Sequence, residues 1–273
     1  MNPYLEIIRP GTSLIAGLGA VVGTIIAGAP FCTASLYIFL TVFFMTGAGM
    51  AINDYYDLEI DKINAPHRPL PSQRMSARTA LGYSLFLFIS SLVFATLTNV
   101  YCFGLALFNS LIEFFYAKTF KKWWLLGNIM VSWLAGSVFL FGAMVTFDFR
   151  LVGILSGLAF LANMGREIFK TIEDIKGDRK MNLDTLPIGS GIKNAKEIAR
   201  GFICLAVILS PLPYLSGLLK DTYLQIVLIS DLIFLYSLFQ PPTKAKNLAK
   251  IAMFIVLLAI LVSFKDPSAV IGW

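Results

Sequence analysis

Residues 36–61 read LYIFLTVFFMTGAGMAINDYYDLEID, an apolar run that passes directly into a cluster of amide and carboxylate side chains. A helix needs roughly 20 mainly apolar residues to cross a bilayer core about 30 Å thick. The apolar part, 36–54, is therefore predicted to be a transmembrane helix whose polar end lies at the membrane surface.

The rest of the chain has the same apolar character. Of its 273 residues, 57% are hydrophobic and 14% are charged, whereas soluble domains are about 45–50% apolar and roughly 25% charged. Further windows of spanning length cover 10–29, 78–97, 99–117, 125–146, 151–170, 197–217, 222–240 and 247–264. These features exclude an ordinary soluble domain and predict an all-α membrane protein with nine transmembrane helices in a single domain, 1–273.

The distribution of basic residues predicts the orientation. Only Arg150, Lys220 and Lys265 of the 22 Lys and Arg residues fall in one of the two alternating sets of loops. Because the basic side faces the cytoplasm, the N-terminus is expected inside and the C-terminus outside. The net charge of +6 on so apolar a chain fits a cell membrane with anionic lipid better than it fits nucleic acid, which is not an expected partner.

Two cytoplasmic connections, about 55–77 and 171–196, are much longer than the external ones. Loops longer than about 12–15 residues are usually functional or disordered, and these contain charges and prolines at definite places. Three prolines surround Arg68 and stiffen its loop, so that it can hold a cation in place. We expect the two connections to form a cap over an active site on the cytoplasmic side.

Carboxylates gather at the ends of two predicted helices. Asn53, Asp57 and Asp61 follow one another at four-residue spacing and share a helix face, with Asp54 beside them. Asp174 and Asp178 form a second pair at this spacing. Like charges at this spacing repel, and a hard cation would remove that cost.

All-oxygen ligands suit Mg²⁺, which completes its shell with water and substrate phosphates. Basic residues expected on the same face are Arg68, Arg74, Lys118, Lys121, Lys122, Lys170 and Arg179. A site that binds a diphosphate needs carboxylates that hold a metal ion and free basic side chains that contact the phosphate oxygens, and both kinds of residue occur here. The alternative is that these charges belong to solvated loops and only set topology, although Asp and Glu contribute little to topology.

A diphosphate held at the membrane surface, with a hydrocarbon chain between the helices, fits a prenyl diphosphate. Metal and cations would stabilise the departing diphosphate, and the prenyl carbon would become carbocation-like. Aromatic faces near the site, such as Tyr116, could stabilise that cation. An acceptor nucleophile would then capture it.

The sequence resembles the signature regions of the UbiA superfamily of intramembrane prenyltransferases. The resemblance rests on the two acidic motifs, on Arg68-Pro69-Leu70-Pro71-Ser72 and on Thr185-Leu186-Pro187. The resemblance implies nine helices around a lipid-accessible central cavity. It also implies two Mg²⁺ ions on a prenyl diphosphate, with Asp54 as an accessory residue; the implied ligands are Asn53, Asp57, Asp61, Asp174 and Asp178. Tyr116-Ala117-Lys118 and Lys121 resemble the region where the family contacts diphosphate.

Within the superfamily, Arg166-Glu167-Ile168 and the compact length resemble archaeal enzymes of lipid biosynthesis. This resemblance implies transfer of a geranylgeranyl group from its diphosphate to the free hydroxyl of a lipid phosphate acceptor, geranylgeranylglyceryl phosphate. Gln73 and Asp184 depart from the family pattern near the motifs, which weakens the assignment of the acceptor.

Two other functions stay open. An aromatic acceptor, as in quinone biosynthesis, would use the same chemistry. An ion or metal transporter is favoured by Asp231 near the middle of window 222–240, but most acidic residues lie in or beside two cytoplasmic loops and not at the midplane. Glu113, near the cytoplasmic end of window 99–117, is expected to orient a lysine or to line the cavity. The oligomeric state is left open.

Overall fold

A computed structural model describes residues 2–29, 32–180, 183–217 and 219–263, and almost all of the regular structure in these ranges is helical. The long helices are α2 (Pro10–Ile26), α3 (Thr33–Tyr56), α5 (Ala77–Thr98), α6 (Val100–Lys118), α7 (Leu126–Thr146), α8 (Arg150–Lys180), α10 (Ile192–Leu209), α12 (Asp221–Ser237) and α13 (Pro242–Ser263). The short elements are α1 (Pro3–Ile7), α4 (Leu58–Asn64), the 3₁₀ turn η1 (Phe120–Lys122), β1 (Trp123–Trp124), β2 (Asp184–Thr185), α9 (Leu186–Gly189) and α11 (Leu212–Leu215).

Each predicted window coincides with one long helix, which confirms an all-helical membrane protein. Seven helical segments in the described ranges are long and apolar enough to cross a membrane, namely α3, α5, α6, α7, α8, α10 continued through α11, and α13. Helices α2 and α12 have 17 residues each, which corresponds to about 26 Å against a core of about 30 Å. Crossing by all nine helices stays a prediction.

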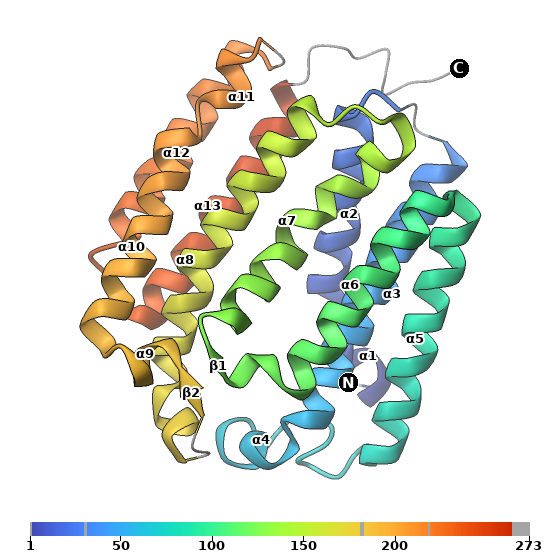
Figure 1. Ribbon diagram of the computed structural model, residues 1–273, viewed down its shortest axis with the longest axis vertical. Coiled ribbons are helices and arrows are strands. Elements are labelled where there is room, and N and C mark those ends of the chain that lie inside the picture. Colours follow the sequence, from blue (N-terminus) through green and yellow to red (C-terminus); the bar gives the residue numbers. More distant parts are fainter. Residues whose placement is uncertain (1, 30–31, 181–182, 218, 264–273) are drawn as a thin grey trace.

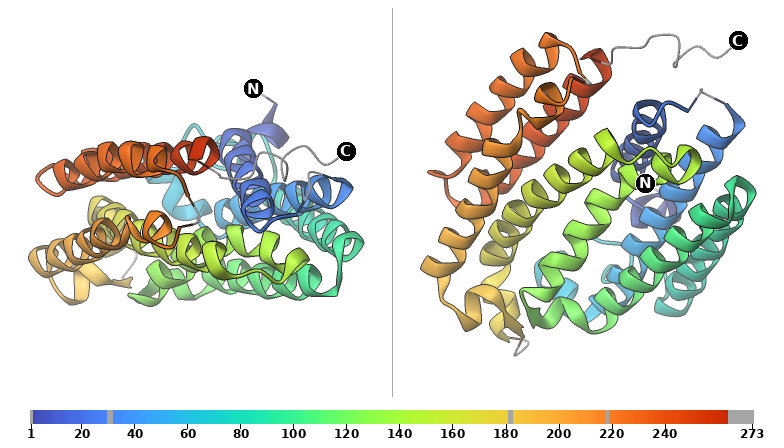
Figure 2. Two further views of the ribbon diagram at one scale, coloured as in Figure 1. Left: turned by 90° about the horizontal axis from the view of Figure 1, so that it is seen from above. Right: turned by 45° about the horizontal axis from the view of Figure 1, so that its top comes forward.

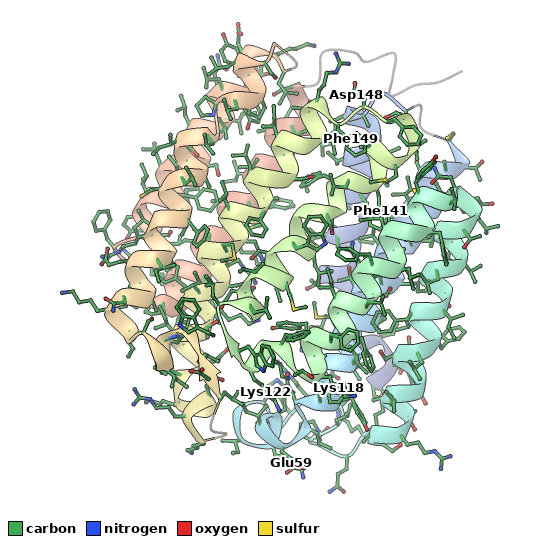
Figure 3. The ribbon with its side chains drawn as sticks, in the orientation of Figure 1. Glu59, Lys118, Lys122, Phe141, Asp148 and Phe149 are labelled. Atoms are coloured by element: carbon green, nitrogen blue, oxygen red, sulfur yellow. The ribbon has the colours of Figure 1, made fainter. Side chains whose placement is uncertain are left out.

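The long helices lie side by side with their axes roughly along one direction (Figures 1 and 2). The most extensive packing joins α3 to α5, α7 to α8 and α12 to α13, while α2 packs against both α3 and α7. One end of the bundle, here named the polar end, contains α4, β1, β2 and α9 (Figure 1). Glu59, Lys118 and Lys122 lie at the polar end, whereas Asp148 lies at the opposite end (Figure 3).

Small residues allow the closest helix crossing. A Cβ atom added to Gly142 of α7 would overlap the backbone of Gly23 of α2, so the two helix backbones are in direct contact. Association of helices within a membrane depends on such packing because lipid tails are as apolar as the side chains. The outer surface is correspondingly apolar; Phe86 and Ile89 of α5 are 60% and 62% exposed.

The prediction of a loop over 171–196 is wrong for the first part of this range, because α8 continues as one helix to Lys180. Charged residues do not end a helix, and Arg179 and Lys180 in its last turn interact favourably with the helix dipole. The 55–77 connection likewise contains α4. Strand β1, which follows α6, pairs in parallel with β2, which follows α8, so the α6–α7 and α8–α10 connections are joined at the polar end.

We expect Gly142→Ala to lower the unfolding temperature of the detergent-solubilised protein, because the added methyl group forces α2 and α7 apart. Overpacking of this kind costs about 1–3 kcal/mol. The matched control is Gly104→Ala in α6, where an added Cβ meets no atom within 4 Å. Equal unfolding temperatures for the two variants would contradict the tight crossing.

Candidate functional site

A cavity of about 1150 Å³ runs from the polar end into the bundle. Its polar-end wall carries the carboxylates and cations described below. Its deeper wall is largely apolar, with residues such as Ile15 of α2, Met45 of α3, Phe139 of α7, Leu158 of α8 and Phe254 of α13. The cavity therefore has a charged part at the polar end that is continuous with an apolar part inside the bundle.

The first acidic cluster is held by arginines. The Arg68 guanidinium donates to Asp61 at 2.6 Å and lies 3.4 Å from Asp54, which also accepts from Arg9 at 2.7 Å. Arg68 is positioned by a turn in which its carbonyl accepts from the Ser72 hydroxyl at 2.6 Å. Burial raises the pKa of Asp61 above its ordinary value, and the Arg68 charge opposes that rise.

Asp57 and Asn53 complete this cluster. Asp57 forms an ion pair with Lys121 from the turn after α6. The Asn53 side-chain oxygen is buried and has no hydrogen-bond partner. A buried oxygen without a partner is costly, so Asn53 is available to a ligand.

The second cluster lies on the last turns of α8. Asp174 and Asp178 both line the cavity, and Asp178 accepts from the Thr185 hydroxyl at 3.2 Å. The charges of Asp57 and Lys121 are close enough to interact with Asp178. The fold therefore brings together two acidic motifs that are more than a hundred residues apart in the chain.

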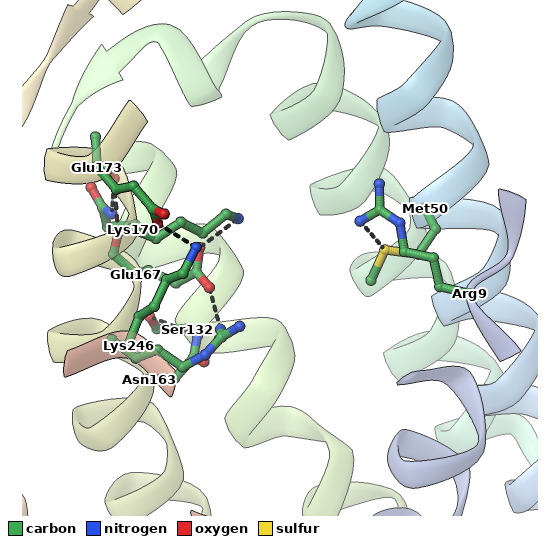
Figure 4. A network of polar contacts seen from close by, with 11 residues as sticks. Arg9, Met50, Ser132, Asn163, Glu167, Lys170, Glu173 and Lys246 are labelled. Atoms are coloured by element: carbon green, nitrogen blue, oxygen red, sulfur yellow. Dashed lines mark hydrogen bonds and ion pairs between the residues drawn. The ribbon is translucent and has the colours of Figure 1, made fainter. Parts of the chain in front are cut away.

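An ionic network continues along α8. Glu167 is buried and pairs with Arg166 and with Lys170, the latter at 3.1 Å, while Arg166 also donates to Asn163 at 3.3 Å. Figure 4 shows Glu167 and Lys170 on one side of the view and Arg9 on the other. Cations thus line the cavity from α8 and from the α1–α2 connection.

Ten of the predicted site residues line this one cavity: Asn53, Asp54, Asp57, Asp61, Arg68, Tyr116, Lys121, Lys170, Asp174 and Asp178. Lys118 does not. It is exposed, and its ammonium lies 5.9 Å from the centroid of the Phe114 ring. Lys118 ends α6 on the face that points away from the cavity, which the spacing alone did not reveal.

Sequence reasoning missed Arg9, which was counted only toward orientation. Its backbone is left-handed, with φ of 47°, and its guanidinium also donates to Met50 Sδ at 3.2 Å. The residue before a proline is disfavoured in the right-handed helical region, so Pro10 excludes Arg9 from α2. A basic residue directly before a proline that begins a helix was the sequence pattern that could have identified Arg9 as a site residue.

Asp231 is accounted for without an ion pathway. It accepts from the Ser210 hydroxyl at 2.6 Å, and the Ser210 carbonyl accepts from Tyr223 at 2.9 Å. All three residues line the cavity, and no ion pair between Asp231 and another residue occurs in the described part of the chain. Hydrogen bonding inside the bundle compensates the buried acid.

The donors present suit Mg²⁺ only together with a ligand. In the described ranges no group of three or more His, Cys, Asp or Glu side chains converges to hold a metal alone. The unpartnered Asn53 oxygen and the carboxylates around the cavity are nevertheless oxygen donors that Mg²⁺ prefers, and Mg²⁺ commonly takes one or two carboxylates with phosphate and water. The residues therefore fit Mg²⁺ whose remaining ligands would be phosphate oxygens and water.

The chain resembles known proteins over nearly its whole length. The model of the UbiA prenyltransferase family matches residues 15–258. A digeranylgeranylglyceryl phosphate synthase of Methanosarcina mazei is 44% identical over 96% of this chain and 98% of its own. A solved structure of a digeranylgeranylglyceryl phosphate synthase in membranes is 38% identical, with a TM-score of 0.79 over 95% of this chain and 96% of its own.

A more distant structure shows the same fold. A UbiA homologue from Archaeoglobus fulgidus, bound to GPP and Mg²⁺, is 21% identical with a TM-score of 0.75 over 95% of this chain and 98% of its own.

We expect Asp57→Asn to weaken Mn²⁺ binding, measured by electron paramagnetic resonance in the presence of a prenyl diphosphate, by at least about tenfold, because one charged oxygen donor of the cavity is lost. Mn²⁺ serves as the spin-active substitute for Mg²⁺. Glu59→Gln is the control, since Glu59 is an exposed carboxylate paired with Lys62 at 2.7 Å. Unchanged Mn²⁺ affinity in Asp57→Asn would remove Asp57 from the metal site.

Proposed function

The chain belongs to the UbiA prenyltransferase family, and from this we propose that it transfers a geranylgeranyl group from geranylgeranyl diphosphate to the free hydroxyl of geranylgeranylglyceryl phosphate. The reaction forms the second ether bond of an archaeal membrane lipid. The carrying observation is the single cavity in which paired carboxylates and cations meet an apolar chamber. The full-length relatives support the choice of acceptor.

In this proposal the polar end holds the diphosphate. Two Mg²⁺ ions would be held by Asn53, Asp57 and Asp61 on one side and by Asp174 and Asp178 on the other. The metal, when bound, stabilises negative charge on the departing diphosphate. Arg68, Lys121 and Lys170 line the same region and would contact its oxygens. Asp54, which pairs with Arg9 and Arg68, keeps these arginines in position. Tyr116, whose ring lines the cavity, would face the carbocation-like carbon.

Cations other than those assigned to the diphosphate also line the cavity and are available to the acceptor phosphate. Arg166 shares Glu167 with Lys170, so it is only partly neutralised. Lys250 of α13 also lines the cavity and has no ion pair in the described part of the chain. These cations support recognition of a second phosphate.

Substrate hydrocarbon chains need a route from the lipid. Helices α2 and α13 both line the cavity but do not pack closely against each other in the described ranges. In this proposal apolar chains enter from the lipid between these two helices, so that they need not pass through water. This arrangement supports lipid substrates on both sides of the reaction.

The proposed topology has all nine long helices crossing the cell membrane, with the polar end and the N-terminus in the cytoplasm. We expect a membrane-impermeant thiol reagent to label Glu59→Cys only from the cytoplasmic side and Asp148→Cys only from the outside, in a background without Cys32, Cys102 and Cys204. The two sites lie at opposite ends of the bundle (Figure 3). Labelling of both from one side would contradict this topology.

The decisive test is transfer from radiolabelled geranylgeranyl diphosphate by the purified protein with Mg²⁺. We expect product with geranylgeranylglyceryl phosphate, much less with the same lipid lacking phosphate because the cations available to the acceptor phosphate then have no partner, and none with 4-hydroxybenzoate. EDTA should stop turnover, and excess Mg²⁺ should restore it. Product with 4-hydroxybenzoate alone would show an aromatic prenyltransferase.

A further inference from the structure

Glu113 lines the cavity from α6 but takes no part in the ion pairs around it. Its Oε2 atom is buried without a hydrogen-bond partner, and no ion pair to its side chain occurs in the part of the chain that the structure describes. Gly49 of α3 lies directly opposite; a Cβ atom there would come within 2.5 Å of the Glu113 carboxyl carbon. Glycine at position 49 therefore leaves the space that this carboxyl group fills.

The carboxyl group lies at a definite depth. Gly49 precedes Asn53 by four residues in α3, which is one helical turn, or about 6 Å. Since α3 runs toward the polar end, Glu113 lies one turn farther into the membrane than the metal-binding oxygens proposed above. In a prenyl diphosphate whose diphosphate lies at those oxygens, the first prenyl carbon and the attacking hydroxyl would be at this depth.

The reaction requires an acceptor for one proton. The bond between the prenyl carbon and the diphosphate oxygen breaks, and its electron pair leaves with the diphosphate. The glycerol hydroxyl oxygen bonds to that carbon and must lose its proton. The cations Arg68, Lys121 and Lys170 cannot accept one in their charged forms, and the carboxylates of both clusters are engaged with cations, with Thr185 or, in the proposed function, with metal.

We propose, on the basis of the function proposed above, that Glu113 is the general base that accepts the proton of the acceptor hydroxyl. Glu113 lines the cavity, and in the substrate complex the metal and the cations that the proposed function places one helical turn away favour its ionised form. The carboxylate then accepts a hydrogen bond from the acceptor hydroxyl, which supplies a partner that the side chain lacks in the protein alone. The proton moves to this carboxylate as the ether bond forms, and it leaves to water with the diphosphate product.

The test compares Glu113→Gln with the wild type on two acceptors, geranylgeranylglyceryl phosphate and its analogue with a thiol in place of the free hydroxyl. A thiol has a pKa near 8.5 and ionises without a base. We expect Glu113→Gln to transfer to the hydroxyl acceptor about 100-fold or more slowly than the wild type. On the thiol acceptor its rate should stay within about threefold of the wild-type rate, and its affinity for geranylgeranyl diphosphate should be unchanged.

Glu197→Gln is the matched control, because Glu197 is exposed and paired with Arg200 at 2.7 Å; it should match the wild type on both acceptors. Equal losses on the two acceptors, or no loss on the hydroxyl acceptor, would overturn the assignment. If Glu113→Gln does not yield folded protein, Glu113→Asp, which keeps the charge but shortens the reach, undergoes the same comparison. Lack of hydroxyl transfer by the wild type would contradict the proposed function instead.

Discussion

Carboxylates that cluster in a partly desolvated site need compensation by cations or by hydrogen-bond donors, and this requirement organises the polar end of the protein. Arg68 reaches Asp61 at 2.6 Å, and Lys121 pairs with Asp57. These side chains are only partly exposed, so removing either cation leaves a partly desolvated carboxylate without its compensating charge. The ion pairs therefore fix the segments after α4 and after α6 around one cavity.

The same compensation makes the site suited to a charged substrate. A metal ion that binds Asp57 would release Lys121 to a phosphate oxygen, so the total charge stays balanced when metal and diphosphate enter together. On the apolar side of the cavity, the backbones at Gly23 of α2 and Gly142 of α7 are in direct contact. The charged groups and the apolar walls thus occupy different parts of one cavity.

Local patterns predicted much of this arrangement. Hydropathy located every long helix. Four-residue spacing predicted one helix face for Asn53, Asp57 and Asp61, but α3 ends at Tyr56 and Asp61 belongs to the separate helix α4. All three nevertheless line one cavity. Spacing was insufficient for Lys118, because a residue at the end of a helix faces the cavity or the lipid according to the helix rotation. The continuation of α8 to Lys180 was also missed. The charged segment that follows the apolar window 151–170 was predicted to be a loop.

By itself, the sequence determined the class of protein, the positions of its membrane helices and the two acidic motifs, because hydropathy and helical periodicity depend on neighbours along the chain. Only the tertiary structure decided which cation meets which carboxylate. Asp57 and Lys121 are 64 residues apart, and Arg9 and Asp54 are 45 apart. It also placed the Glu113 carboxyl group over Gly49. Such pairings depend on how helices pack and rotate against one another, and no local pattern records that information.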